Sequence, residues 1–298
     1  MPSVSSVEET SAALAEAYRE GRTVRIGDGL TGHGLNRVLE HDPGDLTCTV
    51  EAGVRLSELR AVLGAAGQRL SLDPPGDPTV GALLAHNLSG PLRHRFGAPR
   101  DLVLGVTVVL ADGTVANAGG KVVKNVAGYD LARLVCGSEG RLAFIVRASF
   151  RLHPLPKAAR TLVVETEGTA LVVSRLLRSQ LQPSALDVLH PGRVAILFEG
   201  SPRAVEAQLA QAASLVGGTE AEEDVWEESR RRQALAAFRV HFAPRDLADA
   251  LPSGGEAVIR PAAGVAYGLA RITDDTPPGV RRLFDAIREQ FDPAGVLT

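Results

Sequence analysis

GGKVVKNVAGYDLARLVCGSEGRLAFI, residues 119–145, is the part of the chain that says most about its fold. Glycine recurs through it between two apolar runs, which predicts a backbone that turns sharply or lies very close to another group. Two of the chain's three lysines, Lys121 and Lys124, lie here, and arginine fills almost every other basic position. Because lysine carries a compact, mobile charge, the segment is either a ligand-binding loop or a basic turn in which lysines cluster by chance.

Two further glycine-rich loops precede this segment. The first, Gly27-Asp28-Gly29-Leu30-Thr31, follows a short apolar stretch but opens no clear helix, which argues against a Rossmann fingerprint. In the second, residues 75–82, Thr79 is expected to cap a short helix whose free N–H groups suit a pyrophosphate. Either loop alone could be an ordinary turn. Together the three loops predict a long ligand laid across them, and a flavin dinucleotide fits this footprint better than a mononucleotide.

The composition is typical of a globular protein with two domains. Its 298 residues are 45% hydrophobic and 22% charged, with a net charge of -3, so no basic surface for nucleic acid is expected. The apolar run at residues 102–111 is too short to span a membrane, and Glu8 and Glu9 lie where a signal peptide would be basic and then apolar. These features predict a cytoplasmic protein without a transmembrane segment.

The cysteines and histidines point to no metal site. Cys48 and Cys136 lie far apart in the sequence, so we expect two reduced core thiols rather than a disulfide. The seven histidines lack the spacing of metal ligands.

Apolar periodicity predicts an α+β protein. We expect the sequence His153-Pro154-Leu155-Pro156 to be a stiff connection that separates a first domain, residues 1–153, from a second, residues 154–298. The irregular alternation of the elements favours an α+β sandwich. The predicted helices are residues 7–20, 56–66, 80–85, 170–179, 204–215, 221–237 and 278–291, and the predicted strands are residues 23–26, 46–51, 102–110, 114–116, 142–152, 161–165, 185–189, 193–198, 256–260 and 265–271.

An ordered set of motifs resembles a known flavoprotein superfamily. The motifs are TVG at 79–81, NLSG at 87–90, RDLVLG at 100–105, VLADG at 109–113, GYDL at 128–131 and GSEG at 137–140. This order resembles the FAD-binding domain of the p-cresol methylhydroxylase and vanillyl-alcohol oxidase superfamily, densely over residues 20–152 and thinly elsewhere. Residues 121–140 are most similar to the FAD-binding subunits of glycolate oxidase. The FDPAGVL sequence at 291–297 resembles the closing motif of the family.

The resemblance implies a two-part FAD-binding domain followed by a smaller α+β cap domain. It also implies a set of residues that contact non-covalent FAD, to which we add Lys124 because of the lysine-bearing segment. Ala143 stands where the family has glycine, which narrows the space there. A covalent flavin link through His33 is the less favoured alternative. The expected cofactor contacts are Gly27, Asp28, Gly29, Leu30, Thr31, Gly76, Thr79, Val80, Gly81, Ala82, Asn87, Ser89, Gly90, Gly97, Asp101, Lys124, Glu139, Gly140 and Ile145.

The implied activity is FAD-dependent oxidation of a 2-hydroxy acid, glycolate to glyoxylate, within a glycolate oxidase complex. The implied partners are a larger flavin subunit and an iron–sulfur subunit, which could hold the chain at the inner membrane surface. Such chemistry needs a cation for the substrate carboxylate and a base for the hydroxyl. The candidates are Arg93, His94, Arg95, Arg260 and Tyr267, each of which could equally be a solvated surface residue. A free-standing FAD-dependent dehydrogenase and a scaffold subunit without flavin are the alternatives.

Overall fold

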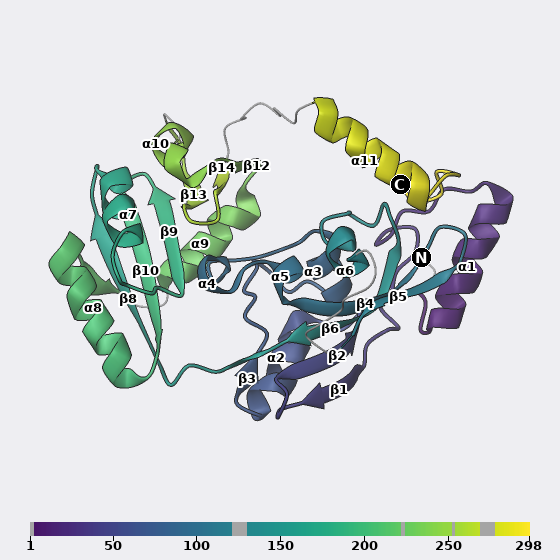
Figure 1. Cartoon of the computed structure of the whole chain (residues 1–298), viewed down its shortest axis with the longest axis horizontal. Coiled ribbons are helices and arrows are strands. Elements are labelled where there is room, and N and C mark those ends of the chain that lie inside the picture. The colour runs from purple at the N-terminus through teal and green to yellow at the C-terminus, as the bar shows by residue number, and fades with distance from the viewer. Residues whose placement is uncertain (1–2, 121–129, 222–223, 252–253, 269–277) are drawn as a thin grey trace.

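The chain folds into two lobes, each built on its own β-sheet (Figure 1). The computed structural model describes residues 3–120, 130–221, 224–251, 254–268 and 278–298. The amino-terminal lobe holds a five-stranded sheet of order β1-β2-β6-β4-β5, and the second lobe holds a seven-stranded sheet of order β11-β8-β10-β9-β13-β14-β12. Neighbouring strands within both sheets are antiparallel. The predicted α+β fold class is confirmed.

Several elements of the amino-terminal lobe lie close to their predicted ranges, whereas β1 and the short helices α4, α5 and α6 were not predicted. Strands β3 and β7 form a small two-stranded sheet. This pairing holds the start of the segment that leads to the second lobe against the amino-terminal lobe. The elements are α1 (Val7–Glu20), β1 (Val38–Asp42), β2 (Thr47–Glu51), α2 (Leu56–Ala65), β3 (Gln68–Arg69), α3 (Val80–Ala85), α4 (Arg93–Phe96), α5 (Pro99–Leu102), β4 (Val103–Val109), β5 (Val115–Gly119), α6 (Leu131–Val135), β6 (Phe144–Arg151) and β7 (His153–Pro154).

Local capping sets the bounds of two helices in this lobe. The Ser6 hydroxyl accepts a hydrogen bond from the Glu9 N–H, and Gly21 ends α1 in the left-handed conformation with φ 64°. The Thr79 hydroxyl accepts from the Ala82 N–H and so starts α3. Both helices are confirmed as predicted. The predicted strand at residues 23–26 is wrong, because only isolated bridges form there and local apolar character alone does not build a ladder.

Two hydrophobic clusters divide the amino-terminal lobe into two parts. One packs α2, α3 and α6 against the sheet, and the other packs α1 and residues 24–35 against the sheet near Phe144. The chain end joins the second cluster through Val296 and Leu297, and Leu297 pairs with Val24. The domain boundary at residue 153 stays a prediction, and the last residues lie with the amino-terminal lobe rather than with the second.

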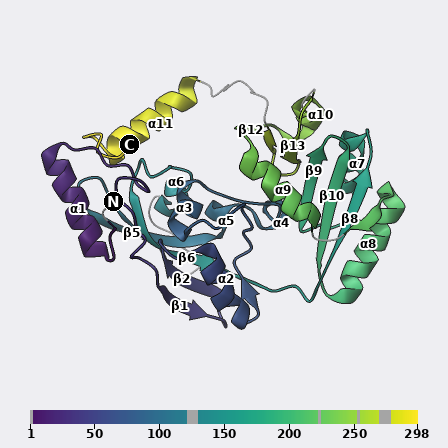
Figure 2. The same ribbon diagram turned by 180° about the vertical axis from the view of Figure 1, so that it is seen from behind.

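The second lobe has helices on both faces of its sheet. Helices α7 and α8 cover one face of the sheet, and α9 packs on the other. Figure 2 shows the lobe from the side opposite to that of Figure 1. The Trp226 indole of α9 donates to the Thr161 hydroxyl at 2.9 Å. The elements of this lobe are β8 (Ala158–Glu165), α7 (Thr169–Leu177), β9 (Ala185–His190), β10 (Arg193–Gly200), α8 (Pro202–Val216), β11 (Thr219–Ala221), α9 (Asp224–Leu235), β12 (Phe238–His241), η1 (Pro244–Asp246), α10 (Leu247–Ala250), β13 (Ala257–Arg260) and β14 (Val265–Gly268). Helix α11 (Pro278–Phe291) follows in the sequence but lies on the side of the amino-terminal lobe (Figure 1).

Polar contacts join the two lobes at separate points. The Arg69 guanidinium of β3 makes a two-pronged ion pair with Glu199 of β10, with N–O distances of 2.7 and 2.6 Å. On α9, the Gln233 amide donates to the Ser89 carbonyl at 2.9 Å. Helix α9 therefore lies between the second sheet and the amino-terminal lobe. None of the helices in the described ranges has the length and apolar character needed to cross a bilayer.

Candidate functional site

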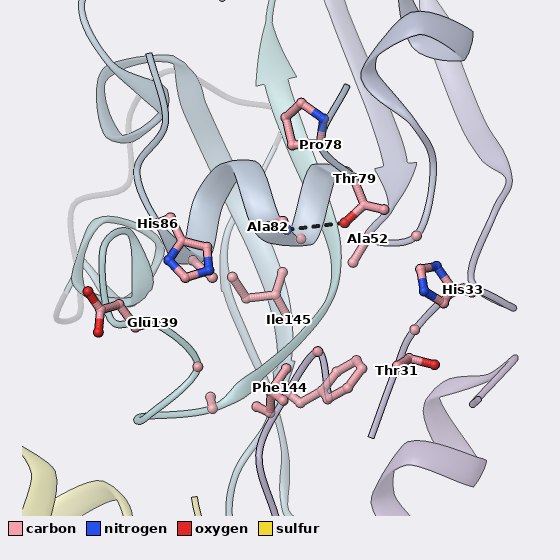
Figure 3. Close-up of a pocket in the computed structure, with 18 of the residues that line it drawn as sticks. Thr31, His33, Ala52, Pro78, Thr79, Ala82, His86, Glu139, Phe144 and Ile145 are labelled. Carbon is pink, nitrogen blue, oxygen red and sulfur yellow. Dashed lines mark hydrogen bonds between the residues drawn. The ribbon is translucent and has the colours of Figure 1, made fainter. Parts of the chain in front are cut away.

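A cavity of about 330 Å³ opens within the amino-terminal lobe, between its two hydrophobic clusters (Figure 3). Helix α3 forms one wall, and the loops before and after the sheet strands form the others. Thr31 and His33 lie at one end of the cavity, while His86 and Glu139 lie at the other (Figure 3). The volume is at the lower end of the roughly 300–1,000 Å³ that small-molecule sites occupy.

The cavity is lined by residues from all three glycine-rich loops, which lie far apart in the sequence. Of the predicted cofactor contacts, those that line it are Gly27, Thr31, Thr79, Gly81, Ala82, Glu139, Gly140 and Ile145. Their role as cofactor contacts stays a prediction. The lining residues that were not predicted as non-covalent contacts are Ile26, Gly32, His33, Ala52, Gly53, Arg55, Pro78, Ala85, His86, Ala143 and Phe144.

Glycine allows these loops to approach closely enough to enclose the cavity. A Cβ at Gly53 would lie 2.1 Å from the carbonyl oxygen of Gly32, so only glycine fits there. The Gly53 N–H donates to the Leu35 carbonyl at 2.7 Å, which fixes this contact. On the opposite wall, Gly140 has φ 79° and its missing Cβ would lie 3.0 Å from Ile26. The cavity is thus a cradle of side-chain-free backbone with an apolar floor from Phe144 and Ile145.

The N–H groups at the start of α3 are already used within the protein. Val80 donates to the Val54 carbonyl at 2.9 Å, and Gly81 donates to the Ala52 carbonyl at 2.7 Å. The Ala82 N–H donates to the Thr79 hydroxyl. The expectation that these groups are free for a pyrophosphate is therefore wrong. Val80 and Gly81 donate to the turn that follows β2, and Ala82 donates to the N-cap hydroxyl of Thr79.

Other backbone N–H groups on the cavity wall remain free. Within the described part of the chain, the N–H groups of Gly32, His33 and Gly140 donate to no acceptor. All three residues line the cavity from two facing loops. Unpaired N–H groups in glycine-rich turns bind anions, so these atoms fit a diphosphate. The signal in the sequence was the glycine run that continues past Thr31 to Gly34.

Several predicted contacts lie outside the cavity and have structural roles. A Cβ at Gly90 would lie 1.9 Å from the Asp73 carbonyl oxygen, so this glycine allows a close backbone contact. Gly97 has φ 82° and abuts the Asp101 carboxylate, which accepts from the N–H at the start of α5. Lys124 lies outside the described residues. The predicted contacts that do not line the cavity are Asp28, Gly29, Leu30, Gly76, Val80, Asn87, Ser89, Gly90, Gly97 and Asp101.

The candidate catalytic residues gather at the contact between the lobes, not in the cavity. The Arg260 guanidinium lies 5.2 Å from the Tyr267 ring centre, and its Nε lies 3.4 Å from the Asp187 carboxylate. Arg260 also donates to the Gln233 amide at 2.8 Å. Burial raises the pKa of Asp187, and the charge of Arg260 opposes this rise. Burial also lowers the pKa of Arg93, and the positive charge of Arg260 lowers it further.

His94 is a weak base in this setting. Burial, assisted by the charge of Arg95, lowers the pKa of His94 to about 4, so the ring is neutral at pH 7. Its Nδ1 is buried and has no hydrogen-bond partner among the described residues. The adjacent Arg95 guanidinium lies 5.8 Å from the centre of the Phe96 ring. The predicted base is therefore poorly suited to abstract a proton at neutral pH.

Within the described ranges, no group of three or more metal-ligating side chains is assembled. Both Cys48 and Cys136 are free thiols, and burial raises the pKa of each to about 12. Neither thiol is therefore a nucleophile at neutral pH.

The sequence of this lobe matches a known domain family. Residues 3–119 match the family model described as FAD binding domain. Over these residues the amino-terminal lobe is similar to FAD binding domains. Its cofactor is FAD, and the cradle of free N–H groups with an apolar floor fits a dinucleotide that carries a diphosphate and flat rings.

Several curated relatives match more than half of this chain. The chain is 35% identical over 201 residues to "Glycolate oxidase subunit GlcE" of Escherichia coli, covering 66% of this chain and 56% of the relative. It is 34% identical to "Glycolate oxidase subunit GlcD" of Bacillus subtilis over 59% of this chain and 39% of that relative. A mitochondrial D-lactate dehydrogenase of Saccharomyces cerevisiae is 31% identical over 58% of this chain and 30% of its own length. The chain thus spans about half, or less, of these relatives.

A solved structure extends the likeness beyond the FAD binding domain. An alkyldihydroxyacetonephosphate synthase superposes with a TM-score of 0.72, covering 99% of this chain and 74% of that protein at 18% sequence identity. At this identity the match concerns the fold alone, and it includes the arrangement of both lobes.

Proposed function

We propose that the chain is the FAD-carrying subunit of a glycolate oxidase complex that oxidises glycolate to glyoxylate. The observation that carries the proposal is the glycine-lined cavity of the amino-terminal lobe, in a chain 35% identical to a protein named as a glycolate oxidase subunit. Bound FAD supplies an acceptor for the hydride that leaves the α-carbon of a 2-hydroxy acid.

The residues of the cavity have distinct tasks in this proposal. The N–H groups of Gly32, His33 and Gly140 hold the diphosphate, because they lie in glycine-rich turns of the wall and lack partners within the described residues. Phe144 and Ile145 give an apolar surface for a flat ring. The N–H groups of α3 do not take part in binding and instead keep the wall in place.

A subunit that works with partners fits the arrangement better than an independent enzyme. Arg260 is held by Asp187 and Gln233, and His94 is a weak base, so neither is well placed for substrate chemistry in this chain. We therefore assign substrate oxidation to the complex, with a larger flavin subunit and an iron–sulfur subunit as partners. The proposal places the complex on the cytoplasmic side, at the inner membrane through its partners.

An independent FAD-dependent 2-hydroxy acid dehydrogenase is the second candidate, because several relatives are named D-lactate dehydrogenases. Anaerobic addition of glycolate or D-lactate to the purified, FAD-loaded chain separates the two. No bleaching of the flavin absorbance by the chain alone, with bleaching after partners are added, supports the subunit. Full bleaching without partners would establish the independent enzyme, and a colourless protein that takes up no FAD would leave a scaffold.

Filling the cavity tests the assignment of the cofactor site. Ala82→Phe places a ring into the cavity from α3, and we expect the purified variant to lose most of its FAD absorbance. Ala65→Phe is the matched control, since Ala65 is exposed at the end of α2 and does not line the cavity. Equal FAD content in both variants, with both folded by circular dichroism, would contradict the site.

A further inference from the structure

A second cavity, of about 500 Å³, lies between the amino-terminal lobe and α9. It shares no lining residue with the first cavity, which is proposed to bind FAD and is called the FAD cavity below. Its walls come from α2, the turn at residues 73–76 and α9, so both lobes contribute to it. The charged residues of its lining are Arg60, Asp73, Arg230 and Arg231.

The lining carries an excess of positive charge that the protein does not neutralise. The Arg60 guanidinium donates to the Leu72 carbonyl at 2.9 Å, which holds the side chain in place without cancelling its charge. Within the described part of the chain, neither Arg60 nor Arg231 forms an ion pair. The nearest N and O atoms of Arg230 and Asp73 are 3.8 Å apart, beyond hydrogen-bond distance. Three guanidinium groups thus face one carboxyl group.

The single carboxyl group is held in a fixed position. One oxygen of Asp73 accepts from the Leu92 N–H at 3.0 Å, and the glycine at position 90 lets the backbone of residue 73 come close. The other oxygen, the one nearer Arg230, makes no hydrogen bond within the described chain. Burial raises the pKa of Asp73 to about 7, so the group repels an anion only weakly near neutral pH. It can pair with a hydroxyl group in either protonation state.

We propose that this cavity, called the anion cavity below, binds a small organic molecule with at least two oxyanion groups and one hydroxyl group. Guanidinium groups pair with carboxylate and phosphate oxygens alike, so either kind of oxyanion suits Arg60, Arg230 and Arg231. The hydroxyl group of the ligand meets the free oxygen of Asp73. Since the walls belong to both lobes, the occupant stabilises the contact between them.

The turn at residues 73–79 links this site to the FAD cavity. Pro74, Pro75 and Gly76 line the anion cavity, and Pro78 and Thr79 line the FAD cavity. The segment between them is fixed, because the Asp77 carboxylate accepts from the Ser57 N–H and hydroxyl at 2.8 Å each. A ligand in the anion cavity therefore contacts the same short turn that forms part of the cofactor wall.

Isothermal titration of the FAD-loaded protein at low ionic strength tests the proposal. The probes are citrate, which carries carboxylates and a hydroxyl, and 3-phosphoglycerate, which carries a phosphate. Binding of either supports the site and identifies the preferred oxyanion. Tricarballylate, which is citrate without its hydroxyl, is expected to bind at least about threefold more weakly because it leaves Asp73 unpaired.

Substitutions assign the binding to the cavity. Arg60→Gln and Arg231→Gln each remove one guanidinium of the lining, and each should weaken binding of the better probe about tenfold, equivalent to ~1.4 kcal/mol. Arg178→Gln, at an exposed position after α7, is the matched control and should bind as the parent does.

Four results would overturn the proposal. They are no binding of either probe, unchanged binding in both cavity variants, sulfate binding as tightly as citrate, and loss of FAD absorbance in Arg231→Gln. The last result would mean that this second cavity holds part of the cofactor. Failure of the proposed FAD site would be seen separately, as an unchanged FAD content in Ala82→Phe.

Discussion

Glycines allow close backbone contacts both at the FAD cavity and elsewhere in the protein. Gly53, Gly90 and Gly97 each stand where a Cβ would overlap a neighbouring atom at under 3 Å. Only Gly53 lines the cavity, and the other two serve contacts inside the protein. Sequence patterns mark all such glycines alike, so the ligand-facing ones could not be separated from the structural ones before the contacts were known.

The contact between Gly53 and Gly32 leads to a prediction for stability. Gly53→Ala should lower the free energy of unfolding by ~2 kcal/mol or more and lower FAD content, because the added Cβ would meet a carbonyl oxygen at 2.1 Å. Chemical denaturation and flavin absorbance measure the two effects. Gly64→Ala in α2, where nothing lies within 4 Å, should instead be neutral or raise stability by about 0.5–1 kcal/mol. A stable, FAD-loaded Gly53→Ala would contradict the contact.

Asp73 predicts a pH dependence of stability. Its pKa is raised by burial to about 7 from 3.8, so between about pH 4 and 7 the folded state keeps a proton that the unfolded state has lost. Stability from this group therefore falls as pH rises through that window, by about 1.4 kcal/mol for each unit of pKa difference. Asp73→Asn should flatten this fall in urea denaturation at pH 5 and pH 8. The same slope in the variant and the parent would remove Asp73 as its cause.

Among the helices and strands, those with local signals in the sequence were predicted best. Helices α1, α3 and α11 begin and end where capping residues, proline or periodicity predict. Strand β1 was not predicted, because it is a polar edge strand without regular alternation. The loops of the FAD cavity were predicted one by one. The wall at Ala52 and Gly53 was not, since its place depends on contacts between distant segments.

The first turn of α1 offers a test of local capping. Ser6→Ala removes the hydroxyl that accepts from the Glu9 N–H, and we expect stability to fall by about 1 kcal/mol. Ser6→Asp keeps an acceptor and should recover most of the loss, which thermal unfolding can follow. A drop of the same size in Ser6→Asp would mean that the hydrogen bond is not the source of the stability.

At the scale of the molecule, the ion pair between Arg69 and Glu199 is a measurable link between the lobes. Both side chains are largely buried, at 16% and 9% exposure, so screening by solvent is weak. A double-mutant cycle with Arg69→Met and Glu199→Gln should give a coupling energy of about 1–3 kcal/mol. The exposed pair Arg22 and Glu20 is the control and should couple by less than ~0.5 kcal/mol. Equal coupling energies in the two pairs would argue against a firm link.

The pairing of Val24 with Leu297 has a consequence for biosynthesis. All residues that line the FAD cavity lie between positions 26 and 145, and they leave the ribosome well before residues 292–297. The loop that begins at Val24 nevertheless gains its last neighbours only when those late residues arrive. A nascent chain is therefore expected to acquire its coenzyme loosely during translation and to retain it firmly only once residues 292–297 have emerged.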